Sequence, residues 1–244
     1  MTWFGRPDSD SGREPQIYRG RQSEDGRQSD REVARGRGRP FVRPQDDPPG
    51  TSRLFVAVPV ADEVRAAVGK LMGQVAGGPI TERGPGKPRW VRVDDLHLTL
   101  RFLGPTPDEH QAEIAAALAT AAAETAPFRV VLSGGGAFPS AHAPRVLWIG
   151  IAEGSDNLTG LVRHLNRELA PLGFPADTRP FTPHLTLART DGVAGADERA
   201  RVLAEAARHL RFTWQADRIV LYKTLVGSGP VHYESLAEAR LALG

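Results

Sequence analysis

The chain has 244 residues and a formal net charge of +2, from 31 lysines and arginines against 29 aspartates and glutamates. Such a small positive excess is weak evidence for nucleic-acid binding. The absence of cysteine excludes disulfide bonds, thiolate catalysis and cysteine-ligated zinc. The sequence contains no run of about 18 apolar residues that could span a membrane and no apolar core of a secretory signal. We therefore expect a soluble cytoplasmic protein with no membrane partner.

Residues 1–50 differ in composition from the rest of the chain. They are rich in Arg, Asp, Gly, Ser, Gln and Pro, and their apolar residues are scattered singly. Such a segment cannot bury enough apolar surface to offset the entropy of ordering. We expect a disordered tail over residues 1–50 and a folded domain over residues 51–244. The Arg-Gly run at residues 35–39 could contact RNA without sequence preference, although a solvated tail without function is the simpler interpretation.

The ordered part begins with an apolar run at residues 54–58 that is typical of a buried strand. Apolar residues at helical spacing follow over residues 64–75. Strands are predicted over residues 90–93 and 97–103, and Gly104-Pro105 is expected to end the second of them.

A helix is predicted to start at Thr106, which suits the N-cap position. Pro107 fits the first turn and Glu109 completes a capping box. The alanine-rich helix behind them runs to about residue 125. The elements predicted after it are strands over residues 128–133, 145–151, 184–188, 218–225 and 233–237, and helices over residues 158–169 and 202–210.

Two segments, residues 97–100 and 184–187, both read His-Leu-Thr-Leu. Their alternation is the period of a β-strand, so His and Thr face one side and the two Leu face the core. Two such strands side by side would present two imidazoles and two hydroxyls to one pocket. That set of groups can move protons on both sides of one anionic group, and phosphate is the obvious candidate. The repeat also suggests two pseudo-equivalent α+β lobes with strands of each lining a shared groove.

A histidine on one face of a strand is more often structural than catalytic. A structural account, however, gives no reason for His at the start of both strands. A zinc site usually has a third protein ligand, and the other five histidines stand alone in helix or loop contexts, at positions 110, 142, 164, 209 and 232. No nucleophile elbow supports Ser-His-Asp catalysis. We therefore expect no metal and no other cofactor.

The two motifs resemble the signature of the 2H phosphoesterase superfamily. The finer resemblance is to the bacterial and archaeal RNA 2′,3′-cyclic phosphodiesterases, historically called 2′-5′ RNA ligases, and it covers about residues 52–238. It is carried by residues 53–57, 89–91, 96–104, 136–139, 145–148, 179–189 and 221–222. The resemblance implies an α+β fold of two lobes, with antiparallel sheets flanking a central groove and helices outside.

The resemblance further implies hydrolysis of a 2′,3′-cyclic phosphate at an RNA end to a 2′-phosphomonoester, without a metal. It makes His97 the proton donor and His184 the proton acceptor, and it makes Arg189 a phosphate clamp. The unperturbed imidazole pKa of about 6.5 would let one histidine be neutral and the other protonated near neutral pH. The hydroxyls of Thr99 and Thr186 would donate hydrogen bonds to the non-bridging phosphate oxygens.

Strict alternation would put Arg189 on the face opposite His184, so a bulge or the strand's end must redirect it. Arg101 lies four residues after His97 and should share its face, where it could contact substrate phosphate or simply be solvated. Phe55, Trp90 and Phe181 could stack a base, although each lies in a strand-like run where core packing is favoured.

Two alternatives stay open. The same two histidines could form a 2′-5′ RNA bond in the reverse reaction, or the chain could bind RNA ends without catalysis. The paired histidines argue against the second, because binding alone needs positive charge rather than titratable pairs. The partners expected are RNA with a 2′,3′-cyclic phosphate end, tRNA fragments among them, or small cyclic-phosphate nucleotides, and the chain is expected to be a monomer.

Overall fold

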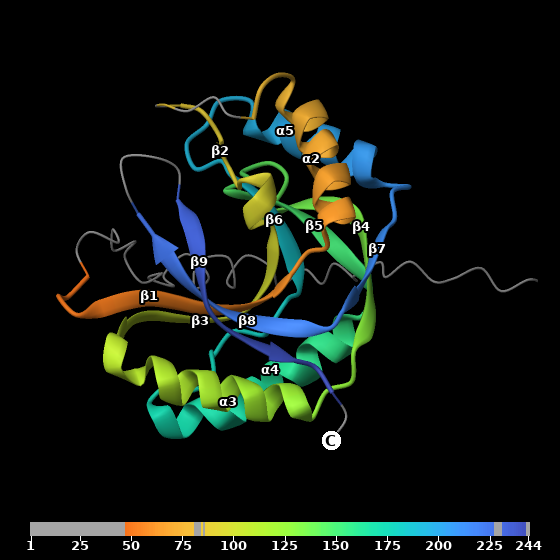
Figure 1. The fold of residues 1–244 in the computed structure, drawn as a ribbon. Helices are drawn as coiled ribbons and strands as arrows, with labels where there is room; N and C mark the ends of the chain where they lie inside the picture. The colour runs from red at the N-terminus through yellow and green to blue at the C-terminus, as the bar shows by residue number, and fades with distance from the viewer. Residues whose placement is uncertain (1–46, 81–83, 85, 227–230, 243–244) are drawn as a thin grey trace, which may run out of the picture. The chain divides into compact units, whose positions relative to one another are not determined.

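The computed structural model describes residues 47–80, 84, 86–226 and 231–242. The chain divides into two units, Met1–Val42 and Arg43–Gly244. The first unit lies outside the described residues, and the second holds all the helices and strands drawn in Figure 1. The tail predicted over residues 1–50 lies outside the described residues up to residue 46. Its disorder, and the domain boundary after it, stay predictions.

The described residues form nine strands and four α-helices. The strands are β1 (Thr51–Pro59), β2 (Arg89–Trp90), β3 (His97–Pro107), β4 (Phe128–Phe138), β5 (Val146–Glu153), β6 (His184–Arg189), β7 (Phe212–Ala216), β8 (Arg218–Leu225) and β9 (His232–Arg240). The helices are α2 (Asp62–Ala76), α3 (Gln111–Ala123), α4 (Ser155–Leu169) and α5 (Ala196–Ala207). Short 3₁₀ turns are η2 (Val93–Asp95), η3 (Asp108–His110) and η4 (Ala170–Leu172). None of these helices is long and apolar enough to cross a membrane.

Two antiparallel sheets carry the fold. The first has the order β3-β1-β8-β9 and the second the order β2-β6-β5-β4-β7. Helices α3 and α4 pack together against the first sheet, and α2 and α5 pack together against the second. Figure 1 shows the two helix pairs at the bottom and the top of the view, respectively. The predicted α+β fold of two antiparallel lobes with helices outside is therefore confirmed.

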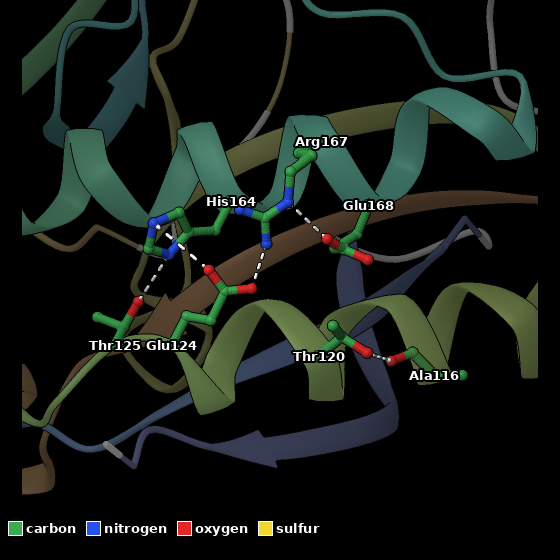
Figure 2. Close-up of polar contacts among 7 residues, drawn as sticks. All are labelled: Ala116, Thr120, Glu124, Thr125, His164, Arg167 and Glu168. Atoms are coloured by element: carbon green, nitrogen blue, oxygen red, sulfur yellow. Dashed lines mark hydrogen bonds and ion pairs between the residues drawn. The ribbon is translucent and has the colours of Figure 1, made fainter. Parts of the chain in front are cut away.

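Helix α4 shows how an amphipathic sequence builds the outer layer. Its leucines recur at helical spacing and are all fully buried, at 158, 161, 165 and 169. Its other face carries polar contacts to the end of α3 (Figure 2). Arg167 pairs with Glu124 and, at 2.8 Å, with Glu168, while the His164 Nδ1 lies 3.3 Å from the Thr125 hydroxyl. Exposed ion pairs of this kind stabilise little, so the buried leucines hold the layer in place.

Strand β3 continues past the predicted end at Gly104-Pro105. Pro105 pairs with Arg53 of β1, and because β3 is an edge strand the missing N–H of proline costs no ladder bond. Thr106 is buried in this strand and its hydroxyl donates to the Gly104 carbonyl at 3.1 Å. The predicted N-cap at Thr106 is therefore wrong, and the α-helix starts only at Gln111. Pairing with β1 overrides the local capping signal.

Strand β4 extends beyond the predicted range of residues 128–133 and continues through three glycines, at 134–136, to Phe138. Gly136 pairs with Trp148 of β5, and a Cβ at this glycine would lie 2.3 Å from the Trp148 ring. Glycine is thus required for the indole to lie over β4.

The predicted strand over residues 90–93 shortens to the two residues of β2. Strand β7 was not predicted, although its alternation of polar and apolar residues could have indicated a strand.

Candidate active site

The two motifs begin two strands of different sheets. Strand β3 starts at His97 and strand β6 starts at His184, and the two strands contact each other. Leu98 and Leu185 are buried, at 1% and 0% exposure, while the histidines are only partly buried. The expected separation of an apolar and a polar face is confirmed for the start of both strands.

One aromatic side chain, Tyr233, interacts with groups of both motif strands. Tyr233, on β9 of the first sheet, packs edge-on against His97 with ring centres 5.1 Å apart. The charge of Arg189, on β6 of the second sheet, lowers the pKa of this same tyrosine, although burial raises it overall. Tyr233 therefore lies near the catalytic candidates of both strands.

A β-bulge interrupts β3 at the fourth residue of its motif. Thr99 pairs with Ala57 of β1, but the next pair joins Arg101 to Val56, which leaves Leu100 as the extra residue. An extra residue reverses the alternation of side chains beyond it. The face of His97 and Thr99 therefore continues at Phe102 and not at Arg101.

The same bulge occurs at the same place in β6. Thr186 pairs with Trp148 of β5 and Ala188 pairs with Leu147, which leaves Leu187 as the extra residue. Arg189 thereby returns to the face of Thr186, and the bulge required for this residue is confirmed. The charge of Arg189 is among the causes that lower the pKa of His184, so the guanidinium acts on the imidazole.

The expectation that Arg101 shares the face of His97 is wrong. The bulge turns its side chain to the helix-covered side of the sheet, where it is 6% exposed. The guanidinium donates to the Pro175 carbonyl and pairs with Asp177. Arg101 thus ties β3 to the segment that leads into β6, and it is neither solvated nor on the polar face.

Both histidines make the same backbone hydrogen bond. The His97 Nδ1 donates to the Asp95 carbonyl at 2.7 Å, and the His184 Nδ1 donates to the Thr182 carbonyl at 2.7 Å. Because a carbonyl can only accept, the hydrogen is held on Nδ1 in each ring. The Nε2 atom of each histidine is left to accept a proton when neutral or to donate one when charged.

Aromatic rings surround each imidazole. Phe55 lies beside His97 with ring centres 4.8 Å apart, and Phe138 packs edge-on against His184 at 5.1 Å. The Trp148 ring, next to Phe138, lies 6.4 Å from His184. No sequence pattern indicated Phe138, Trp148 or Tyr233 as site residues, because aromatic residues in strands are ordinarily core residues.

The aromatic residues that were weighed as base-stacking candidates are core residues instead. Phe55 and Trp90 are 2% and 7% exposed. Phe181 is partly buried and packs against the hydrophobic core. The favoured interpretation, core packing, is confirmed for these three residues.

The aromatic surroundings change the titration of both histidines. Burial lowers the pKa of His97 to about 4, against a smaller opposing effect of the Asp95 carbonyl. Burial also lowers the pKa of His184, and the Arg189 charge adds to that shift. The free protein at neutral pH therefore holds both imidazoles neutral, in contrast to the unperturbed value near 6.5 that was expected.

The site holds groups for acid–base chemistry on an anion and no evident metal ligands. In the parts of the chain that the structure describes, no group of three or more His, Asp or Glu side chains could hold a metal ion. The polar face instead offers two Nε2 atoms, two threonine hydroxyls and one guanidinium. This set can bind a phosphate and move protons on either side of it.

Comparison with known proteins identifies the family that the chain resembles. Residues 58–227 match the family described as the 2′-5′ RNA ligase superfamily. The chain is 36% identical over 187 residues to a Geobacillus stearothermophilus protein named RNA 2′,3′-cyclic phosphodiesterase, covering 76% of the chain and 56% of the relative. It is 31% identical over 193 residues to a Thermotoga maritima protein of the same name, covering 79% of the chain and 97% of the relative. The chain thus spans little more than half of the Geobacillus relative and, at 54%, of the Aquifex aeolicus relative.

Solved structures share the fold. The structure of the Thermus thermophilus protein TT0787 matches with a TM-score of 0.61 and 30% identity, over 78% of this chain and 97% of that one. Escherichia coli LigT complexed with 3′-AMP matches with a TM-score of 0.63 and 24% identity, over 78% of this chain and 98% of that one.

The lowered pKa of His97 predicts a loss of stability in acid. The unfolded chain takes up this proton near pH 6.5 and the folded chain only near pH 4, so protonation favours the unfolded state between those values. The free energy of unfolding should fall by up to about 3 kcal/mol between pH 6.5 and pH 4 on this account. Urea titrations followed by circular dichroism measure it.

The matched variants for this test are His97→Gln and His142→Gln. The first should flatten the fall in stability, whereas the second, at an exposed histidine, should leave it as in the wild type. Equal slopes against pH in the wild type and His97→Gln would contradict the burial of a neutral His97.

Proposed function

The chain belongs to the 2′-5′ RNA ligase superfamily, and on this premise we propose that it hydrolyses the 2′,3′-cyclic phosphate at an RNA end to a 2′-phosphomonoester. One observation carries the proposal: two histidines begin two strands that contact each other, and each has its Nδ1 held by a carbonyl. Relatives named RNA 2′,3′-cyclic phosphodiesterase support the reaction class.

The two imidazoles divide the proton transfers between them. His184 accepts a proton at Nε2 from the attacking water, while the new P–O bond forms. His97 donates a proton from Nε2 to the 3′-oxygen as the P–O3′ bond breaks. In-line displacement puts the water and the leaving oxygen on opposite sides of phosphorus, which is where histidines from two facing sheets would stand. Exchange with solvent then returns both rings to their starting states.

The other polar groups of the two strands stabilise the phosphate. Thr99 and Thr186 lie two residues after the histidines on the same faces, and their hydroxyls donate to the non-bridging oxygens. Arg189 supplies a charge-assisted bond to the same group. These donors act most strongly on the negative charge that grows in the transition state.

The bound phosphate also prepares the proton donor. His97 is neutral in the free protein at pH 7, since its pKa is about 4. An adjacent anion favours the charged imidazole and raises that pKa. His97 thus becomes an acid when an anionic substrate occupies the site, and the two rings titrate as a coupled pair.

The substrates we propose are RNA ends with a cyclic phosphate, tRNA fragments among them, and small cyclic-phosphate nucleotides. The reaction needs no metal in this account, because the two histidines and Arg189 supply the proton transfers and the positive charge. A monomeric state and a cytoplasmic location remain predictions.

Substitution of either histidine should remove most of the activity. His97→Ala and His184→Ala should each lower turnover of a nucleoside 2′,3′-cyclic phosphate by about two orders of magnitude or more, the usual effect of one acid–base group. The double variant should be little worse than either single one, because the pair acts as a unit. His142→Ala, at an exposed histidine, is the control. Near-wild-type turnover in either single variant would remove that histidine from the mechanism.

The two arginines that follow the motifs should behave differently. Arg189→Met should lower turnover by roughly tenfold to a hundredfold, because it removes a charge-assisted bond to phosphate. Arg101→Met should stay within about twofold of the wild type, since the Arg101 side chain contacts Pro175 and Asp177 and does not reach the polar face. Steady-state kinetics on the same substrate compares them. A folded Arg101→Met protein as inactive as Arg189→Met would contradict the position of Arg101 outside the site.

The identity of the product tests the orientation of the substrate. With EDTA present throughout, phosphorus NMR should show a 2′-phosphomonoester, because the 3′-oxygen leaves toward His97. A 3′-phosphomonoester would reverse the docking of the ribose, and activity that needs added zinc or magnesium would contradict a metal-free reaction. Binding without turnover would favour an RNA-end-binding module, and joined 2′-5′ products without hydrolysis would favour a ligase.

A further inference from the structure

Strand β1 presents a cation on the face of the first sheet that carries His97. Leu54 and Val56 pack into the hydrophobic core, whereas the ring of Phe55, between them in the sequence, lies 4.8 Å from His97. β1 runs against β8 without a bulge at these positions, so its side chains alternate regularly between the two faces. Arg53 therefore shares the face of Phe55 and His97, and its side chain is 26% exposed.

A carboxylate from outside the sheet holds the Arg53 guanidinium. The Nε and Nη2 atoms of Arg53 donate to the two carboxylate oxygens of Asp47 at 3.1 and 2.5 Å. Asp47 precedes β1, and a turn folds it back toward the strand. Thr51 closes this turn, because its N–H and its hydroxyl both donate to the Pro48 carbonyl, at 3.2 and 2.6 Å. The fork of donors on Arg53 is therefore occupied by an anion of the protein itself.

The geometry of this ion pair matches that of a phosphate contact. Arginine binds carboxylate and phosphate with the same paired donors, so either anion can occupy the fork. An RNA chain that ends in the active site carries further phosphates upstream of its cyclic end, and contacts to phosphates dominate the affinity of proteins for nucleic acid. Two residues of a β-strand rise about 7 Å, which places Arg53 a short step beyond Phe55 on the face of His97. An RNA chain that leaves the site along β1 thus meets a second guanidinium.

We propose that Arg53 is a second phosphate subsite, which binds a backbone phosphate upstream of the cyclic end of RNA and which Asp47 occupies in the free protein. The inference rests on the proposed function, because the two histidines locate the end of the RNA. Binding replaces one anion on Arg53 by another, whereas a cyclic mononucleotide has no upstream phosphate and leaves the ion pair intact. The subsite therefore makes the enzyme prefer RNA ends over mononucleotides, and Asp47 limits that preference.

The test measures the preference for RNA, which is the ratio of the KM for adenosine 2′,3′-cyclic phosphate to the KM for a six-nucleotide RNA with the same cyclic end. Asp47→Asn should raise this ratio about fivefold, because the RNA phosphate no longer competes with a carboxylate. Arg53→Gln should lower it on the order of tenfold, since it removes the charge-assisted contact. Glu205→Gln and Arg208→Gln remove the same charges from an exposed ion pair at the end of α5, and they should leave the ratio unchanged. A ratio that Asp47→Asn lowers or leaves unchanged would overturn the inference, whether or not Arg53→Gln folds.

Binding measurements separate this inference from the proposed function. Fluorescence anisotropy measures the affinity for the six-nucleotide RNA with a 2′-phosphate end, which needs no turnover. For Arg53→Gln the slope of log Kd against log salt concentration should fall by about 0.7, the contribution of one single-stranded phosphate contact, and Asp47→Asn should bind more tightly than the wild type. If the wild type hydrolyses no cyclic phosphate, the proposed function fails, and the anisotropy still decides on the subsite. Equal affinities of the wild type and Asp47→Asn, or an unchanged slope for Arg53→Gln, would overturn the subsite even if hydrolysis is observed.

Discussion

Each motif strand carries an extra residue directly after its threonine, where a bulge interrupts its pairing with the strand beside it. The extra residues, Leu100 and Leu187, are buried, and so are the residues that follow them, Arg101 and Ala188. Two consecutive buried side chains are possible only because the bulge interrupts the pleat. The rest of the site depends on this feature, because it selects which side chain beyond the threonine reaches the polar face.

The bulge also separates two arginines that look alike in the sequence. Arg189 follows its histidine by five residues and reaches the polar face, whereas Arg101 follows by four and is buried. Its guanidinium contacts Pro175 and Asp177 of the segment before β6. Arg101 therefore links a strand of the first sheet to the segment that leads into the second. A difference of one position in a bulged strand therefore decides whether an arginine side chain reaches the polar face or is buried.

Burial of the histidines links the stability of the protein to its chemistry. The rings of Phe55 and Tyr233 around His97 exclude water, and the loss of hydration holds the free imidazole neutral. The same exclusion of water strengthens every interaction with a bound phosphate, because charges act more strongly in a medium of low dielectric constant. In the proposed mechanism, proton donation by His97 then depends on the anion that the site binds, which couples the acid to the presence of its substrate.

The local sequence was sufficient to predict the strand period of both motifs, the faces of their first three residues, and the helices with regular apolar spacing such as α4. These features depend on side chains a few residues apart. The bulge positions, the burial of Arg101, the place of Thr106 in a strand and the lowered pKa of His97 all depend on contacts that form in the folded protein. Strand register is set by hydrogen bonds to β1 and β5, and burial is set by rings from β1 and β9. Those partners are distant in the chain, and the pattern of a single segment carries no information about them.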